Sequence, residues 1–263
     1  MKTVVMSQSS VYAGDLILVN RQHPYREEKT DHTLVPVCRE STNVLMERKA
    51  VVMLSRIMDD IHGWSQIAAV SGWRSMQEQQ EIYRQSLQEN GIAFTKKFVA
   101  IPGCSEHQTG LAIDLGLRQP DIDFIRPDFP YSGICRMFRE KAASFGFVER
   151  YPAGKEDVTG IAHEPWHFRY VGMPHAAIMA ERGLTLEEYI AFLRRFSYGI
   201  KSYEYRKDGL DTAVSYLPAV SGTNTQINID TEVSCSVSGN NVDGFIITEW
   251  REKSGNRKES WRA

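Results

Sequence analysis

The sequence predicts an α+β fold, because helix-like and strand-like patterns follow one another over the first 200 residues. Apolar residues recur at helical spacing over residues 41–64, and large and small residues alternate with the period of a strand over 111–117. Beyond residue 200, only short strand-like segments separated by turn-forming residues occur. We therefore expect a mixed domain followed by a small β appendage.

The helices and strands can be placed in chain order from these patterns. Two of the helices begin with a capping box, formed by Ser75 with Glu78 and by Thr185 with Glu188. Gly91 follows the first of them in the position that a C-cap favours. The predicted strands are 16–20, 67–73, 111–117, 147–151 and 166–171, and the predicted helices are 41–64, 75–90, 133–145, 173–182 and 185–196.

The last quarter of the chain is expected to form a small β-meander. Its strands are predicted near residues 203–205, 212–216, 226–230 and 244–250. The final residues combine charges with glycine and serine, which is typical of a mobile tail. We therefore expect a main domain over 1–199, a β-rich extension over 200–250 and a charged tail over 251–263.

Composition limits the class of protein and its location. The net charge of −2 and the pI near 6.4 give no reason to expect a polyanionic partner. Four widely scattered cysteines are most simply read as reduced thiols. No apolar run is long enough for a signal peptide or a membrane-spanning helix, so the sequence predicts a cytoplasmic protein.

The first cluster of chemically active residues runs from Ser105 to Asp114. His107 lies in a turn-prone segment between Gly103 and Gly110. In the strand that follows, alternation places leucine and isoleucine on the core face and Asp114 on the other face, between two small residues. A histidine in the loop and an aspartate on the strand form a reasonable half of a metal site.

The second cluster lies about fifty residues later and contains His163, Glu164 and His167. Strict alternation would place His163 and His167 on one face of the strand and Glu164 on the other. Pro165 cannot donate to a ladder, so the alternation need not extend across it. His167 is therefore a candidate ligand, and spacing alone leaves the choice between Glu164 and His163 open.

Two imidazoles and one carboxylate form the donor set of a catalytic zinc site. Such a site takes three protein ligands and leaves the fourth position to water, from which a further glutamate can remove a proton. The alternative is a structural zinc site, but these are usually closed by four ligands and favour cysteine, of which Cys104 is the only nearby candidate. The pattern therefore favours a zinc hydrolase.

Three motifs give the chain a specific resemblance to the zinc D-alanyl-D-alanine peptidases of vancomycin resistance (the VanX, VanY and VanXY group) and to the related L,D-carboxypeptidases. The motif S-x-H-x-x-G-x-A-x-D matches residues 105–114, and E-x-W-H matches residues 164–167. The motif S-G-[YW]-R-S matches residues 71–75 and is followed by Gln79. The resemblance covers about residues 40–195 and implies a central antiparallel sheet with flanking helices.

The resemblance implies a role for each matching residue. His107, Asp114 and His167 would hold one Zn²⁺ per chain. Glu164 would be the catalytic base and later the acid, and His163 has no role in the family. The resemblance therefore favours Glu164 where spacing left the two residues equal.

The remaining implied roles concern the substrate. Arg74 would hydrogen-bond the scissile carbonyl as it becomes an oxyanion, a role that suits a permanently charged guanidinium. Gln79, Ser105 and Trp166 would contact the substrate, with Ser105 and Trp166 near its terminal D-residue.

The enzyme implied by the resemblance is a zinc metallopeptidase whose catalytic domain covers residues 1–199. It would act as a D,D-carboxypeptidase on the D-Ala-D-Ala terminus of peptidoglycan precursors, with D,D-dipeptidase activity as an additional expectation. Two alternatives stay open, an L,D-carboxypeptidase acting on tetrapeptides and a non-catalytic peptidoglycan-binding module. Peptides ending in D-Ala are the expected partners, with no nucleic acid and no membrane span.

Overall fold

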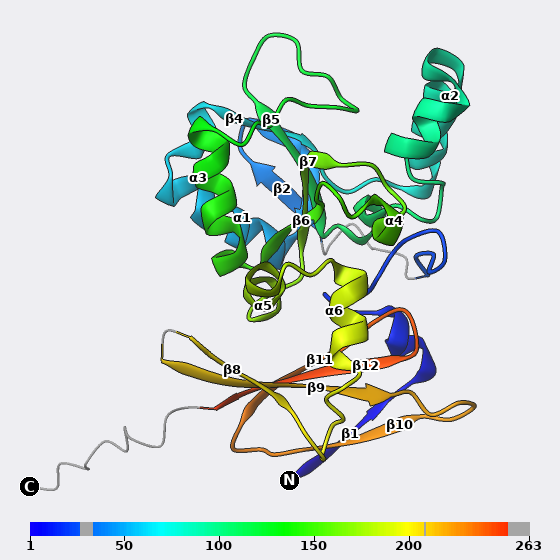
Figure 1. The fold of residues 1–263 in the computed structure, drawn as a ribbon, viewed down its shortest axis with the longest axis vertical. Helices are drawn as coiled ribbons and strands as arrows, with labels where there is room; N and C mark the ends of the chain where they lie inside the picture. The colour runs from blue at the N-terminus through cyan, green and yellow to red at the C-terminus, as the bar shows by residue number, and fades with distance from the viewer. Residues whose placement is uncertain (27–33, 208, 252–263) are drawn as a thin grey trace, which may run out of the picture. The chain divides into compact units, whose positions relative to one another are not determined.

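The structure is a computed structural model and describes residues 1–26, 34–207 and 209–251. Apart from Arg251, the predicted tail lies outside these residues. The chain divides into two compact units, 15–189 and 1–14 together with 190–263. The predicted α+β class is confirmed (Figure 1). The predicted domain boundary at residue 199 stays a prediction.

The larger unit is built on a four-stranded antiparallel sheet in the order β4-β5-β7-β6. A separate hairpin joins β2 to β3. The strands of this unit are β2 (Leu34–Cys38), β3 (Ser41–Glu47), β4 (Ile67–Ser71), β5 (Ala112–Leu117), β6 (Phe147–Tyr151) and β7 (Glu164–Tyr170). The central antiparallel sheet that the resemblance implied is therefore present.

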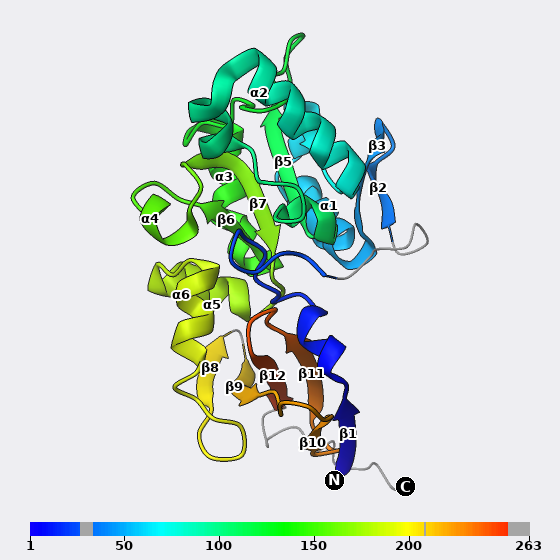
Figure 2. The ribbon, with the colours of Figure 1, turned by 90° about the vertical axis from the view of Figure 1, so that its right-hand side faces the viewer.

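The helices are α1 (Arg48–Asp60), α2 (Met76–Phe98), α3 (Gly133–Ala142), α4 (Glu156–Thr159), α5 (His175–Arg182) and α6 (Leu186–Leu193). The last of these spans the division between the units. Helices α1 and α3 cover one face of the sheet, and α2 lies on the other side (Figures 1 and 2).

The core of this unit lies between the sheet and α1 with α3. Ile113 and Leu115 of β5 are fully buried there against Leu54 of α1 and Phe138 of α3. Burying such a side chain contributes roughly 1.5–3 kcal/mol. Because side chains alternate across a strand, Asp114 lies on the opposite face, as the sequence predicted.

The predicted strand at residues 16–20 is wrong. Its apolar side chains are buried, but its backbone joins no ladder. The carbonyl oxygens of Asp15 and Ile17 instead accept hydrogen bonds from the Arg169 guanidinium, each at 3.0 Å. A side chain distant in sequence therefore replaces the strand partner.

Two predicted helices have different limits. Residues 41–47 of the first form β3, where Val44 and Met46 are buried in alternation with more exposed neighbours, and the helix begins only at Arg48. In the second, Gly91 interrupts the helical geometry with φ 78°, but helical structure resumes and extends to Phe98. The capping box of Ser75 with Glu78 is confirmed.

The smaller unit is mostly β-structure. One sheet has the order β11-β12-β9-β8, and β10 pairs with β1 near the N-terminus. The strands are β1 (Lys2–Met6), β8 (Tyr203–Lys207), β9 (Leu210–Pro218), β10 (Thr225–Ile229), β11 (Ser234–Gly239) and β12 (Gly244–Arg251). The predicted strands are present, but a simple meander is wrong, because β10 leaves the sheet and β11 was not predicted.

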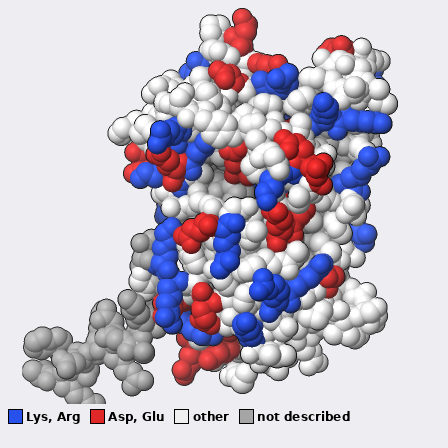
Figure 3. All heavy atoms as spheres, viewed as in Figure 1, with Lys and Arg blue, Asp and Glu red and all other residues white. Residues whose placement is uncertain are grey.

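The remaining features concern the cysteines, the helices and the surface charge. All four cysteines are free thiols. No helix among the described residues combines the length and apolar character needed to cross a bilayer. Basic and acidic side chains are interspersed over the face shown in Figure 3.

Candidate active site

Strands β5 and β7 bring two of the predicted metal ligands together. Asp114 and His167 are directly opposed across the antiparallel ladder, so their side chains share one face of the sheet. His167 Nδ1 lies 2.9 Å from Asp114 Oδ1, and both side chains are buried. Residues 53 positions apart in sequence are therefore adjacent because of strand register.

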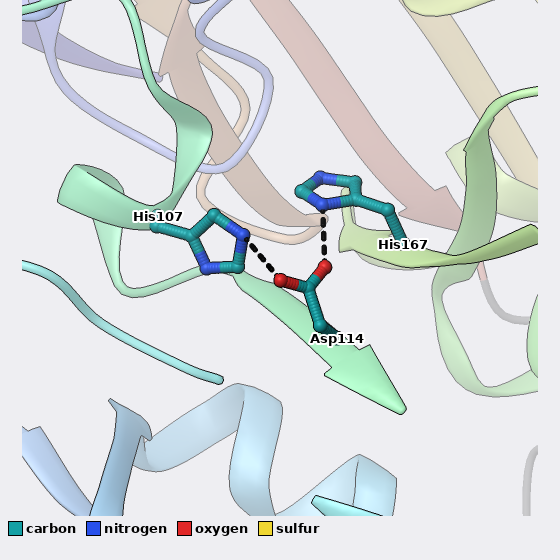
Figure 4. Close-up of side chains that lie close together, drawn as sticks. All are labelled: His107, Asp114 and His167. Carbon is teal, nitrogen blue, oxygen red and sulfur yellow. Dashed lines mark hydrogen bonds and ion pairs between the residues drawn. The ribbon is translucent and has the colours of Figure 1, made fainter. Parts of the chain in front are cut away.

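His107 reaches the same place from a single 3-10 turn, η4 (Glu106–Thr109), that precedes β5. Gly110 ends this turn with φ 70°, and a Cβ there would approach Leu34 to 2.9 Å. The turn directs His107 Nε2 to within 3.1 Å of Asp114 Oδ2. The three side chains point toward one another, as Figure 4 shows.

The outer nitrogen of each imidazole faces an oxygen acceptor. His107 Nδ1 donates to the Gly72 carbonyl oxygen at 2.6 Å, and His167 Nε2 lies 3.5 Å from Glu106 Oε2. Position 72 requires glycine, because a Cβ there would lie 2.2 Å from the Leu45 carbonyl oxygen. When a metal is bound, the protons would lie on the outer nitrogens, and the inner nitrogens would present their lone pairs to the ion.

These atoms fit a zinc ion. One ligand atom from each of His107, Asp114 and His167 lies within 4.8 Å of the others, and no cysteine joins this cluster in the described part of the chain. Two nitrogens and one oxygen form the donor set of catalytic zinc, and three protein ligands leave one position open. Once His167 gives up its inner proton, two imidazole nitrogens and a carboxylate oxygen can bind the same cation.

The electrostatics of the cluster follow from burial and from its own charges. Burial lowers the pKa of His107 to about 4, with help from the positive charge of Arg74. Burial also favours neutral His167, but hydrogen bonds to Asp114 and Glu106 outweigh it and raise the pKa of His167 to about 9. Burial opposes ionisation of Asp114, but the two imidazoles hold its pKa well below the usual range.

Glu164 also faces this site. Between β6 and β7, Glu149 pairs with Phe168 and Tyr151 pairs with Glu164. These two pairs are two residues apart on β6 but four residues apart on β7, so the register is irregular here. This irregularity breaks the alternation and allows Glu164 and His167, three positions apart, to lie together, with Glu164 Oε2 4.0 Å from His167 Nδ1. Burial, with the negative charge of Asp114, raises the pKa of Glu164 to about 8.

His163, the competing candidate, has other partners. Its Nε2 lies 2.7 Å from the Tyr131 hydroxyl and 3.4 Å from Glu149. It is not among the residues that line the pocket around the cluster, whereas Glu164 is.

Arg74 lies on the same pocket, just beyond the end of β4. Its guanidinium donates to Ser71 Oγ at 2.8 Å and to Asp114 Oδ2 at 2.9 Å, and at 3.4 Å to Gln79 Oε1. Burial lowers the pKa of Arg74, and the carboxylates of Asp114 and Glu164 counteract this. A cation is therefore held in a fixed position next to the metal-ligand cluster.

The predicted substrate-contacting residues occupy different positions. Ser105 and Trp166 line the pocket. Gln79 is fully buried, donates to the Ala100 carbonyl oxygen at 2.8 Å and supports Arg74. Its predicted contact with substrate stays a prediction.

The sequence reasoning missed residues that surround the cluster. Tyr151 lines the pocket, and its ring centroid lies 4.9 Å from that of His167. Glu106 is buried behind His167 and bound to Arg150 and Arg169, which hold its pKa well below the usual range against the effect of burial. Apolar walls complete the pocket and come from Ile82, Phe98, Val99, Phe124, Ile125 and Ile161. A tyrosine at the end of a predicted strand and a glutamate beside a candidate ligand were the available signals.

A metal-ligand cluster that shares a pocket with a buried carboxylate and a fixed guanidinium is typical of metal-dependent hydrolases. The fold and site place the protein in this class.

Comparison with known proteins identifies the family. Residues 44–173 match the family model VanY, described as D-alanyl-D-alanine carboxypeptidase. The bifunctional D-Ala-D-Ala dipeptidase and carboxypeptidase VanXYC of Enterococcus gallinarum is 41% identical over 179 residues, which cover 68% of this chain and 94% of that protein. The chain therefore belongs to the VanY family of zinc D,D-peptidases.

Solved structures agree with this assignment. The D,D-dipeptidase VanXYg, crystallised with a D-Ala-D-Ala phosphinate analogue, superimposes with a TM-score of 0.92 at 47% identity, covering 95% of this chain and 99% of that one. A variant of the D,D-pentapeptidase VanY from a VanB-type cassette, solved in complex with Zn(II), gives a TM-score of 0.56 at 31% identity. That match covers 67% of this chain and 98% of the other.

Proposed function

We propose that the protein hydrolyses the D-Ala-D-Ala terminus of peptidoglycan precursors with one zinc ion per chain. The observation that carries this proposal is the buried cluster of His107, Asp114 and His167, which shares its pocket with Glu164 and Arg74. The names of the related dipeptidases and carboxypeptidases support the choice of substrate.

Glu164 is proposed as the proton carrier. When bound by His107, Asp114 and His167, zinc would lower the pKa of water and polarise the scissile carbonyl. The Glu164 carboxylate lies 4.0 Å from His167, within reach of a water molecule beside the ligand cluster. It takes a proton from the attacking water and returns it to the departing amine.

Arg74 is proposed to stabilise the charge that develops on the former carbonyl oxygen. Its bonds to Ser71 and Asp114 hold the guanidinium before substrate arrives, so little reorganisation is needed during the reaction. Gln79 Oε1 accepts a further hydrogen bond from the same guanidinium at 3.4 Å. Ser105 and Trp166, on the pocket wall, are proposed to contact the terminal D-residue.

The test is product analysis with two substrates, D-Ala-D-Ala and UDP-MurNAc-pentapeptide. We expect release of D-Ala from the pentapeptide, loss of this release after chelation of the metal, and its return when Zn²⁺ is added. Release that is unaffected by chelation would contradict the proposal.

The same assay separates the alternatives. Preference for a tetrapeptide over the pentapeptide would indicate an L,D-carboxypeptidase, and binding of muropeptides without turnover would indicate a non-catalytic module. The cytoplasmic location expected from the sequence stays a prediction.

A further inference from the structure

Glu106 is a fully buried carboxylate directly behind one of the proposed zinc ligands. Its relative exposure is 1%, and it precedes His107 on the turn η4. A carboxylate in this position must be compensated by bound partners, because burying an isolated charge is costly.

The two oxygens of Glu106 have different partners. Oε1 accepts from Arg150 Nε at 2.8 Å and from Arg169 at 2.9 Å. Oε2 faces His167 Nε2 at 3.5 Å and accepts no hydrogen bond from another side chain in the described ranges. One oxygen therefore anchors the carboxylate and the other faces the imidazole.

The two arginines are fixed in turn. Arg150 forms two bonds to Glu187, at 2.6 and 2.9 Å, and Arg169 donates to the carbonyl oxygens of Asp15 and Ile17. Both guanidinium groups are almost completely buried. The orientation of Glu106 is consequently determined by rigid neighbours and not by the imidazole that it faces.

We propose that Glu106 is a positioning residue that keeps the proton of His167 on Nε2 and thereby leaves Nδ1 free to bind the metal. Neutral imidazole carries one proton, and a carboxylate accepts hydrogen bonds but donates none. A hydrogen bond at one ring nitrogen therefore selects which of the two is available as a ligand. This inference rests on the metal site of the proposed function.

The competing explanation is that Glu106 only neutralises the buried arginines. Glu187 provides a matched control, because its carboxylate binds the same Arg150 but does not contact His167 in the described structure. Charge compensation involves both glutamates, whereas the choice of tautomer involves Glu106 alone.

The experiment compares the zinc affinity of the wild type, Glu106→Gln and Glu187→Gln by competition with a chelating indicator. In Glu106→Gln the amide oxygen is expected to stay with the arginines, so the NH₂ group faces His167 and favours a proton on Nδ1. We expect zinc affinity to fall about 10- to 100-fold in Glu106→Gln and to change by less than about twofold in Glu187→Gln. An equal loss of zinc affinity in both variants, or no loss in Glu106→Gln, would overturn the inference.

Two further measurements keep the test decisive. Circular dichroism checks that each variant folds. If Glu106→Gln does not fold, Glu106→Asp replaces it, because aspartate keeps the charge but withdraws the carboxylate from His167. The same fall in zinc affinity is then expected for Glu106→Asp. Long-range ¹H–¹⁵N spectra of the zinc-loaded wild type report the proton on His167, and a proton on Nδ1 overturns the inference. Zinc binding without hydrolysis by the wild type would refute the proposed function while leaving this comparison valid.

Discussion

Glu164 and His163 are neighbours in the sequence with very different surroundings. Glu164 is buried beside His167, whereas His163 bonds to Tyr131 away from the pocket. We expect Glu164→Gln to lower kcat by about 100- to 10,000-fold, because the proton carrier is lost, and to keep zinc bound. The control, His163→Gln, should retain kcat. Steady-state kinetics with UDP-MurNAc-pentapeptide provide the measurement, and equal losses of kcat in both variants would contradict the assignment.

Arg74 is expected to act through both its charge and its planar shape. Lysine keeps the charge but cannot bond Ser71 and Asp114 simultaneously with the same geometry. Arg74→Lys should therefore lower kcat about 100- to 1000-fold, the typical effect of removing an oxyanion donor. Arg84→Lys, which alters an exposed ion pair with Glu81, should have no effect on kcat. A kcat for Arg74→Lys within threefold of the wild type would exclude the role.

At the residue scale, the sequence predicted the positions that cluster in the structure. His107, Asp114 and His167 were chosen from residue type, spacing and resemblance, and they lie together. The position of Glu164 could not be derived from alternation, because the irregular register between β6 and β7 is a property of the paired strands. The burial of Gln79 was also not predictable, since it depends on a distant carbonyl group.

Helix α5 contains a buried histidine whose titration should be visible in stability. His175 hydrogen-bonds the Tyr189 hydroxyl at 2.8 Å, and burial lowers its pKa from an ordinary 6.5 to about 3. The unfolded chain therefore binds a proton below pH 6.5 that the folded chain does not. The free energy of unfolding should be constant with respect to this group above pH 6.5 and fall as pH decreases toward 3.

The variant His175→Gln removes this titration while retaining an acceptor for Tyr189. Between pH 7 and pH 5, the wild type should lose about 2 kcal/mol more stability than the variant. Urea denaturation at several pH values measures this difference. In the exposed control, His62→Asn, the free energy of unfolding should depend on pH as in the wild type. Parallel curves of this free energy against pH for all three proteins would refute the prediction.

At the scale of elements, the sequence predicted helices and strands best where their hydrogen bonds join residues that are close in sequence. The capping box of Ser75 and Glu78 is self-contained, and it is present. Residues 16–20 have a strand-like composition, but the carbonyl groups of Ile17 and of the preceding Asp15 bond to Arg169. The strand β10 pairs with β1, more than 200 residues away in sequence, and no local pattern reports such a partner.

For the whole molecule, metal binding is expected to stabilise the folded state. An ion that binds only the folded chain adds about 2.7 kcal/mol when its concentration is one hundred times its Kd. We expect EDTA to lower the Tm measured by calorimetry, and Zn²⁺ to restore it. Mg²⁺ should not, because it prefers oxygen ligands in octahedral geometry. An unchanged Tm after verified removal of zinc would contradict this prediction.

The sequence by itself determined the α+β class and the residues that could hold a metal, because residue type and period are local properties. Only the tertiary structure decided that Asp114 faces His167, that Glu164 turns toward them, and that Glu106 stands behind His167 between two arginines. The physical reason is that strand register and buried ion pairs depend on partners far apart in the chain, whose positions are set only when the core has packed.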